Sequence, residues 1–181
     1  MSLGESGETA WHAARAHKLC INAVLNPLAA LLGVDNGSVA RAMALKGAGA
    51  VTGVHALAEE LAAEAWAWAY FGGFHSIFRD ATDLLDAARD AAVATSANIN
   101  SALADARSAR LGESDFISGA VLRGAVGRGG DAPATRRVLS ALHARERAFG
   151  VRTSMVDARV ASIIQVAVAH TAQSARPAPF F

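Results

Sequence analysis

Residues 18–37 read KLCINAVLNPLAALLGVDNG, a run of mostly Leu, Ile, Val and Ala that predicts a helix. Lys18, Asn22 and Asn26 interrupt this apolar run at intervals of four residues. On a helix, that spacing places all three side chains along one narrow stripe. A core helix gains nothing from a polar stripe unless the stripe faces water, a partner or a ligand. The stripe is therefore the first candidate site.

The helix predicted around this stripe extends from residue 11 to residue 32 and contains Pro27. Proline lacks a backbone N–H and clashes with the preceding turn, so we expect a kink or a break beside Asn26. The sequence GVDNG at residues 33–37 is typical of a turn, and Ser38 is the expected N-cap of the helix that follows.

The composition favours a single all-α domain. A chain of 181 residues can bury a sizeable core, and about a quarter of its residues are Ala, the strongest helix former. The net charge of +1 offers no electrostatic reason to expect a nucleic acid or a membrane surface as partner. The single cysteine, Cys20, excludes an internal disulfide and suits a reducing compartment, so we expect a cytoplasmic protein.

No stretch predicts a membrane span, and residues 1–10 lack the pattern of a signal peptide. We expect a polar leader at residues 1–10, a helical domain at 11–171 and a loose tail at 172–181. No segment predicts a strand, and the domain should hold six to seven helices. The helical patterns cover residues 11–32, 39–45, 54–70, 82–107, 114–128, 133–149 and 153–171, with Thr82 as a candidate N-cap.

The glycine-rich stretch LKGAGAVTG at residues 45–53 invites comparison with a dinucleotide-binding loop. The G-x-G-x-x-G pattern needs its third glycine at position 52, which is Thr52, and the preceding residues predict a helix rather than a strand. The sequence therefore favours a loop between helices over a phosphate-binding loop. Trp66 and Trp68, near the end of the next helix, favour core packing over a stacking platform.

Other motifs for chemistry are missing from the sequence. The six histidines form no H-x-x-x-H or H-E-x-x-H pattern, one cysteine cannot build a zinc site, and no G-x-S-x-G occurs. We therefore expect no metal site and no nucleophilic hydrolase.

A second polar stripe lies at Asn98, Ser101 and Asp105, on one face of the predicted helix 82–107. Glu113 follows Ser101 by twelve positions. On an unbroken helix these two residues would lie roughly 18 Å apart, too far to share a small ligand. A common site therefore requires a chain break within residues 107–112, where Gly112 offers one.

The two stripes together resemble the C-terminal domain of ketopantoate reductases (2-dehydropantoate 2-reductases). The first signature is Lys18, Asn22 and Asn26-Pro27, followed by an apolar run ending in Asn-Gly. The second, NINSALADARSARLGESDFISG at residues 98–119, has the order and the spacing of the family's other signature. The resemblance covers residues 18–149, and it implies the family's all-α C-terminal fold.

The resemblance also implies a chemistry, the NADPH-dependent reduction of ketopantoate to pantoate on the route to pantothenate. It assigns Lys18 as the general acid and places Glu113 beside it, at the nicotinamide end of the cofactor. It assigns substrate binding to the asparagines of both stripes and to the signature serine, that is, to Asn22, Asn26, Asn98 and Ser101. The opening stripe would then be half of an active site.

Members of this family carry an N-terminal Rossmann domain, which has no counterpart in this chain. The resemblance therefore implies the substrate-binding half of an oxidoreductase that neither binds NADPH nor turns over alone. Its expected partners are a small 2-ketoacid and the missing Rossmann domain, with a homodimer left open. Two alternatives remain: a catalytically silent helical oligomerisation module or gene remnant, and the C-terminal domain of another two-domain 2-ketoacid or 3-hydroxyacid dehydrogenase.

Overall fold

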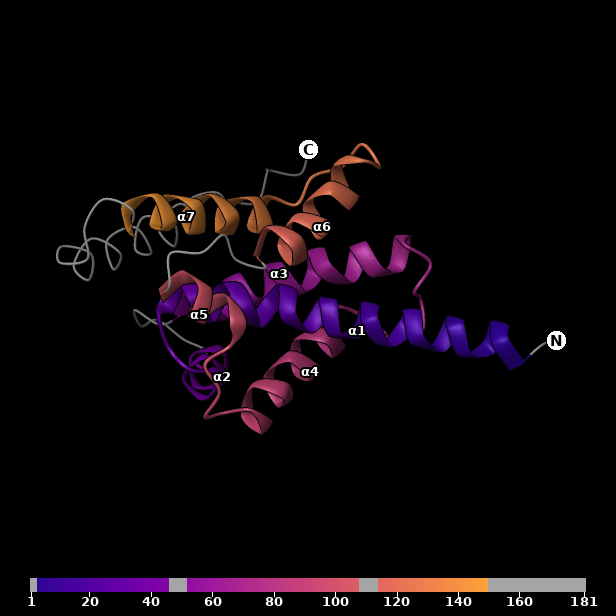
Figure 1. Cartoon of the computed structure of the whole chain (residues 1–181), viewed down its shortest axis with the longest axis horizontal. Helices are drawn as coiled ribbons and strands as arrows, with labels where there is room; N and C mark the ends of the chain where they lie inside the picture. Colours follow the sequence, from indigo (N-terminus) through magenta and orange to yellow (C-terminus); the bar gives the residue numbers. More distant parts are fainter. Residues whose placement is uncertain (1–2, 46–51, 108–113, 150–181) are drawn as a thin grey trace, which may run out of the picture.

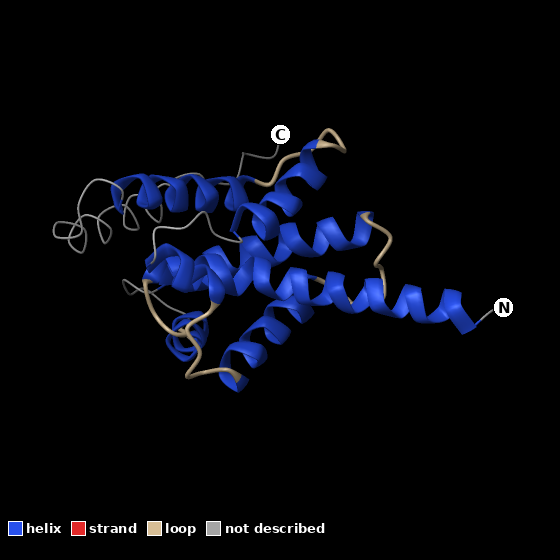
Figure 2. Ribbon diagram, in the orientation of Figure 1, coloured by secondary structure: helices blue, strands red, loops and turns tan. Residues whose placement is uncertain are grey.

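The computed structural model describes residues 3–45, 52–107 and 114–149 (Figure 1). Seven helices lie in these ranges, and no strand does (Figure 2), which confirms the all-α prediction. The helices are α1 (Leu3–Leu32), α2 (Asn36–Ala44), α3 (Thr52–Phe71), α4 (Ala81–Ala94), α5 (Ser101–Arg107), α6 (Ser114–Val126) and α7 (Pro133–Phe149). The helix predicted at 153–171 and the tail at 172–181 lie outside the described residues.

Helix α1 is the centre of the fold and contacts each of the other six helices. Figure 1 shows α3 running beside it, α2 and α4 on one side, and α6 and α7 on the other. Residues 23–30 of α1 are all buried, and three of them are Ala, whose small side chain lets neighbouring helices approach closely. The N-terminal part of α1 extends beyond this core (Figure 1).

Of the kink or break predicted beside Asn26, the break is wrong, because α1 continues through Pro27 to Leu32. Proline removes one hydrogen bond from the helix interior. Burial of Leu25 and Leu28 on either side holds the turn against that loss. The helix ends instead at Gly33, whose φ of +73° is the left-handed conformation that glycine adopts without strain.

Two predicted N-caps, Ser38 and Thr82, are also wrong. The carboxylate of Asp35 caps α2 by accepting the N–H of Ser38 at 2.7 Å, and Asp80 caps α4 in the same way. Both aspartates have extended backbone, the conformation that lets a side chain fold back onto the first turn. The backbone N–H of Ser38 lowers the pKa of Asp35 below its ordinary value.

The continuous helix predicted over residues 82–107 is wrong as well. Helix α4 ends at Ala94, residues 95–100 form a loop, and a separate helix, α5, begins at Ser101. Asn100 caps α5, because its side-chain oxygen accepts the N–H of Leu103 at 3.0 Å. Local capping thus competes with helix continuation at this point.

Asn36 and Gly37, at the start of α2, hold this loop in place. The Asn36 amide donates to the Thr95 hydroxyl at 2.9 Å and accepts from the Asn100 amide at 3.2 Å. The N–H of Gly37 donates to the Ser96 carbonyl at 3.0 Å. A Cβ at position 37 would lie 2.9 Å from that of Ser96, so glycine is needed for the close approach. Asn-Gly thus fixes where α5 begins.

Helix α7 is attached to the core at both ends by charged side chains. Near its start, the Glu64 carboxylate of α3 accepts the N–H groups of Ala134 and Thr135 at 2.7 and 2.8 Å. Further along, Arg145 donates to the carbonyls of Ala30 and Leu31 at the C-terminal end of α1. The predicted start of this helix at residue 133 is confirmed, and a residue of another helix satisfies its first turn.

Within the described residues, no single helix combines the length and the apolarity needed to cross a membrane. Helices α1 and α2, which meet at 100°, pass that test only when taken as a pair.

Candidate functional site

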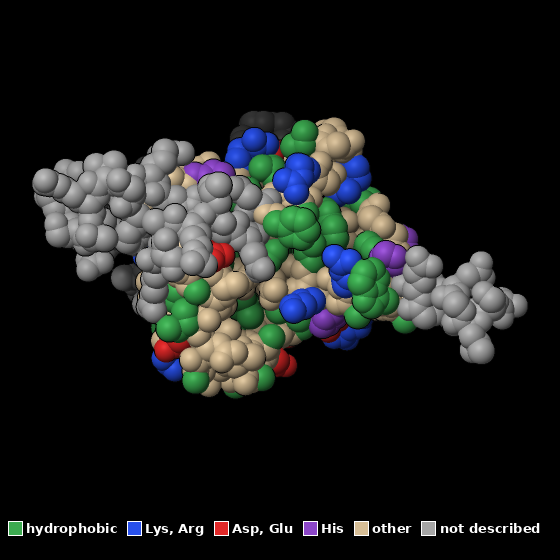
Figure 3. Space-filling view, viewed as in Figure 1, with side chains coloured by type: hydrophobic (Ala, Val, Ile, Leu, Met, Phe, Trp, Pro, Cys, Tyr) green, Lys and Arg blue, Asp and Glu red, His purple; other side chains and the backbone are tan. Residues whose placement is uncertain are grey.

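An open cleft of about 720 Å³ lies where α1, α3, α5 and α6 come together. From α1 it is lined by His12, Arg15, Lys18 and Asn22 among others. Figure 3 looks onto a face of the molecule where apolar surface lies beside Lys, Arg and His side chains. The cleft has the size of a small-molecule site.

Three of the predicted site residues meet in this cleft. Lys18 and Asn22 line it from successive turns of α1, and Ser101 lines it from the start of α5. Lys18 and Ser101 are exposed, and Asn22 is half-buried. The loop that separates α4 from α5 brings Ser101 to α1, since Asn36 and Gly37 tie that loop to α2.

Two other predicted residues, Asn26 and Asn98, are not among the described residues that line the cleft. Asn26 is only 4% exposed, because α1 has entered the core by that turn. Asn98 is exposed on the loop before α5, where its carbonyl accepts the N–H of Asn36 at 3.2 Å. Asn98 therefore does not share a helix face with Ser101 and Asp105. Glu113 lies outside the described residues.

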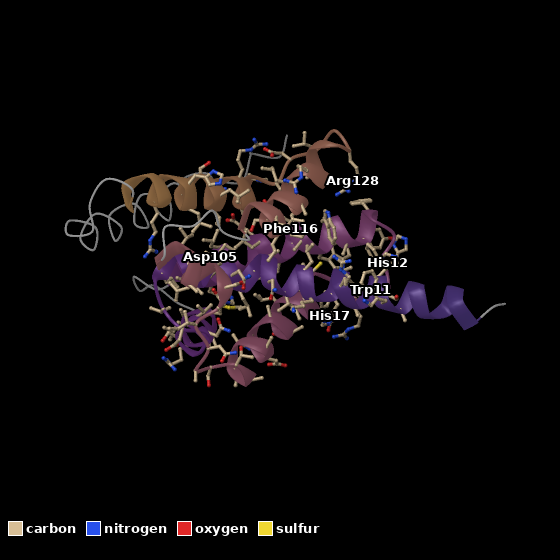
Figure 4. The ribbon with its side chains drawn as sticks, viewed as in Figure 1. Trp11, His12, His17, Asp105, Phe116 and Arg128 are labelled. Carbon is tan, nitrogen blue, oxygen red and sulfur yellow. The ribbon has the colours of Figure 1, made fainter. Side chains whose placement is uncertain are left out.

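His12 and Arg15 belong to the cleft although the sequence analysis did not select them. Both lie on the face of α1 that carries Lys18, at helical spacings of three residues. This spacing could have identified both residues from the sequence, but they precede the apolar run that begins at Lys18. The Arg15 guanidinium lies 4.5 Å from the centroid of the Trp11 ring, and Figure 4 shows Trp11 and His12 on the exposed half of α1.

Aromatic residues form much of the remaining lining. Trp68 at the end of α3 stacks on Phe74, with ring centroids 6.2 Å apart, and Phe116 of α6 lines the same cleft. Trp66 and Trp68 both pack partly buried against the core, as predicted, but Trp68 also faces the cleft. No spacing in the sequence relates Phe116 to α3, so this contribution needed the tertiary structure.

The charge of the cleft favours an anionic ligand. Arg15 and Lys18 bring positive charge, and no Asp or Glu is among the described residues that line the cleft. An ammonium one helical turn from an amide can hold a carbonyl oxygen that gains negative charge during a reaction. The Ser101 hydroxyl adds a donor for a carboxylate.

Two other chemistries find less support in the described part of the chain. No group of three or more His, Cys, Asp or Glu side chains there could hold a metal ion. Burial raises the pKa of the Cys20 thiol to about 12, so the thiolate nucleophile is absent at neutral pH. Cys20 instead donates to the carbonyl of Ala65 at 3.6 Å.

The amino-acid sequence is similar to a known protein family and to a characterised relative. Residues 10–146 match the family model described as ketopantoate reductase PanE/ApbA C terminal. A 2-dehydropantoate 2-reductase of Yersinia pestis is 32% identical over 143 residues, which cover 77% of this chain and 42% of that protein. The chain therefore spans less than half the length of this relative.

A solved structure shares the fold. The ternary structure of D-mandelate dehydrogenase with NADH and anilino(oxo)acetate aligns with a TM-score of 0.62 at 19% sequence identity. The alignment covers 78% of this chain and 72% of the dehydrogenase chain. At that identity the similarity establishes the fold alone.

Proposed function

The chain belongs to the ketopantoate reductase family, whose C-terminal domain it matches, and on that premise we propose that it is the substrate-binding and catalytic helical half of an NADPH-dependent 2-dehydropantoate 2-reductase. One observation carries the proposal. Lys18, Asn22 and Ser101, which lie in two signatures far apart in the sequence, line one cleft.

The proposed reaction adds a hydride and a proton to a ketone to give an alcohol. A nicotinamide cofactor, when bound, would supply the hydride for the ketone carbon. As the C=O bond is reduced, negative charge develops on its oxygen. The Lys18 ammonium stabilises that charge and donates the proton, and the Asn22 amide N–H donates a hydrogen bond to the same oxygen or to the neighbouring hydroxyl.

The substrate's carboxylate is assigned to the other side of the cleft. The Ser101 hydroxyl donates to it, and the positive charge of Arg15 and Lys18 favours its approach. We retain Asn26, Asn98 and Glu113 as proposed contributors on the strength of the family signatures. Of these, Glu113 is assigned to the nicotinamide end of the cofactor.

The described residues fit the substrate side of such a site rather than the whole of it. The lining supplies a cation, an amide and a hydroxyl for the ketoacid. The glycine-rich stretch follows helix α2 and precedes helix α3, whereas a pyrophosphate-binding loop follows a strand. We therefore propose that a separate nucleotide-binding domain holds the cofactor, and that the chain alone neither binds NADPH at micromolar concentration nor reduces a 2-ketoacid.

A fusion tests this division of labour. A fusion that joins the unmatched N-terminal part of the Yersinia pestis relative to the N-terminal side of this chain should oxidise NADPH with 2-dehydropantoate, and the chain alone should not. Fluorescence titration of NADPH against both proteins measures the cofactor half separately. A fusion that binds NADPH but reduces no 2-ketoacid would favour the silent helical module. Micromolar NADPH binding and turnover by the chain alone would contradict the need for a second domain.

A further inference from the structure

The cleft described above contains more aromatic surface than a small aliphatic ketoacid uses. We propose that it accepts 2-ketoacids with a planar aryl side chain and binds them more tightly than 2-ketoacids with a branched aliphatic side chain. This inference rests on the proposed function, which assigns the ketoacid head to Lys18, Asn22 and Ser101. It concerns the rest of the ligand, which those three residues do not reach.

Trp68 and Phe74 present a wall that is already in place. Their rings lie 22° from parallel, which is a stacked arrangement, and both side chains are half-buried against the core. Gly124 of α6 secures the indole from another side. A Cβ at position 124 would lie 2.4 Å from the indole ring, so only glycine lets α6 pack this closely on Trp68. Packing already orders these side chains, so binding a ligand here costs little conformational entropy in the protein.

Phe116 adds an aromatic side chain from a second element. It is 68% exposed at the start of α6 and lines the cleft. Figure 4 shows Phe116 near the middle of the molecule. A ligand that covers a benzyl group this exposed removes apolar surface from water, and this favours binding. Ile117 and Leu19 extend the apolar lining beside it.

The division of the lining into polar and aromatic parts sets the ligand's shape. The polar groups suit a carboxylate and a ketone, and the apolar groups are left for the substituent on the ketone carbon. A volume of about 720 Å³ leaves room for a ring beyond the two-carbon head, that is, the carboxylate and the ketone.

A planar aryl group exploits aromatic walls better than a tert-butyl group does. Its face stacks on a neighbouring ring at an offset, and its edge meets another ring in a T-shaped contact. A tert-butyl group makes only dispersion contacts with the same rings. Such aromatic pairs correspond to a roughly two- to twelvefold difference in Kd beyond the area buried.

The test compares two acids with the same head and different side chains. Phenylglyoxylate and 3,3-dimethyl-2-oxobutanoate are titrated into the full chain, and both Kd values are measured by ligand-observed NMR. Phenylglyoxylate should bind about two- to twelvefold more tightly. Phe116→Ala and Trp68→Leu should each bring the two Kd values closer together. Trp66→Leu is the matched control, because Trp66 contacts Tyr70 in a tilted arrangement and is not among the described residues that line the cleft. It should leave the ratio unchanged.

The outcomes separate this inference from the function on which it rests. Equal Kd values for the two acids, or a ratio that survives both Phe116→Ala and Trp68→Leu, would overturn the aryl selectivity. Lys18→Ala should weaken both acids alike. If it weakens neither while the aryl preference persists, the aryl site stands and the ketoacid function fails. Thermal unfolding of each variant checks the fold, and the exposed Phe116 provides a variant that should not disturb it.

Discussion

Helix α1 contains two regions that differ sharply although they share one axis. Its N-terminal part carries Arg15 and Lys18 into solvent at the cleft, whereas residues 23–30 are buried without exception. The buried part lies where α1 meets the rest of the bundle (Figure 1). A helix anchored at one end can hold polar side chains at the other without depending on them for stability.

This difference teaches where substitutions should act. Substitutions in the exposed part should alter binding and activity and leave the stability of the fold unchanged. Substitutions in the buried part should lower that stability. Asn22 and Ala23 mark the boundary, because exposure falls there from half-buried to buried. Four substitutions test this difference between exposed and buried positions, beginning with the one of largest expected effect.

Lys18→Ala in the fused two-domain enzyme should lower kcat by about 10²- to 10⁴-fold, the usual loss when a general acid is removed. The midpoint of thermal unfolding should not change measurably, because the lysine side chain is exposed. Steady-state NADPH oxidation and calorimetry measure the two quantities. A kcat within a few-fold of the parent would contradict the catalytic assignment and leave the stripe a binding or packing feature.

Leu28→Ala should destabilise the chain by about 2–5 kcal/mol, because the side chain is 1% exposed and a cavity would replace it. Urea unfolding followed by circular dichroism measures the loss. Leu45→Ala is the matched control, since Leu45 is 52% exposed and its truncation should stay within about 0.5 kcal/mol. Equal effects of the two changes would remove the distinction between the buried and the exposed surface.

Cys20, close to the boundary within α1, should make stability depend on pH. Its folded pKa of about 12 lies above the ordinary value of 9.0, so the unfolded chain releases the thiol proton first. This contribution is complete below pH 9 and is lost as the pH rises toward 12. Between pH 8 and pH 10 the parent should lose stability relative to Cys20→Ala, by about 1 kcal/mol. Parallel urea titrations measure the difference, and identical pH profiles would contradict the burial of the thiol.

Glu64→Ala should cost about 1 kcal/mol, the usual effect of losing an N-terminal cap. The carboxylate bonds two N–H groups at the start of α7, so hydrogen exchange at Ala134 and Thr135 should accelerate as well. Asp90→Ala, which removes an exposed carboxylate from α4, should have no such effect. Unchanged exchange at α7 would show that water satisfies these groups equally well.

The sequence predicted the helical class and most helix positions because apolar periodicity and alanine content are local properties. The prediction was wrong where a capping side chain begins a new helix and the preceding helix ends. The pattern over 82–107 is helical throughout, yet Asn100 caps a new helix and Asn36 holds the intervening loop. The caps at Asp35 and Asp80 were within reach of sequence reasoning, since Asp is as good an N-cap as Ser or Thr.

The candidate site, like the fold, was predicted only in part from the sequence. Helical spacing alone placed Lys18 and Asn22 on one face, and the same rule would have found Arg15. Asn26 fits that rule too, but the rule does not say where a helix enters the core. The aromatic lining was beyond prediction, because Trp68 and Phe116 approach each other only when α3 packs on α6.

By itself, the sequence determined the identity and the spacing of the chemical groups, since these depend on residue type and on helical periodicity. Tertiary structure alone decided which of those groups share one cleft. Ser101 lines the same cleft as Lys18 because Gly37 lets the loop before α5 pack closely on α2. Glu64 caps a helix that begins 69 residues later, at Pro133. Such contacts join residues far apart in the chain, and only the packed arrangement of helices determines which of them meet.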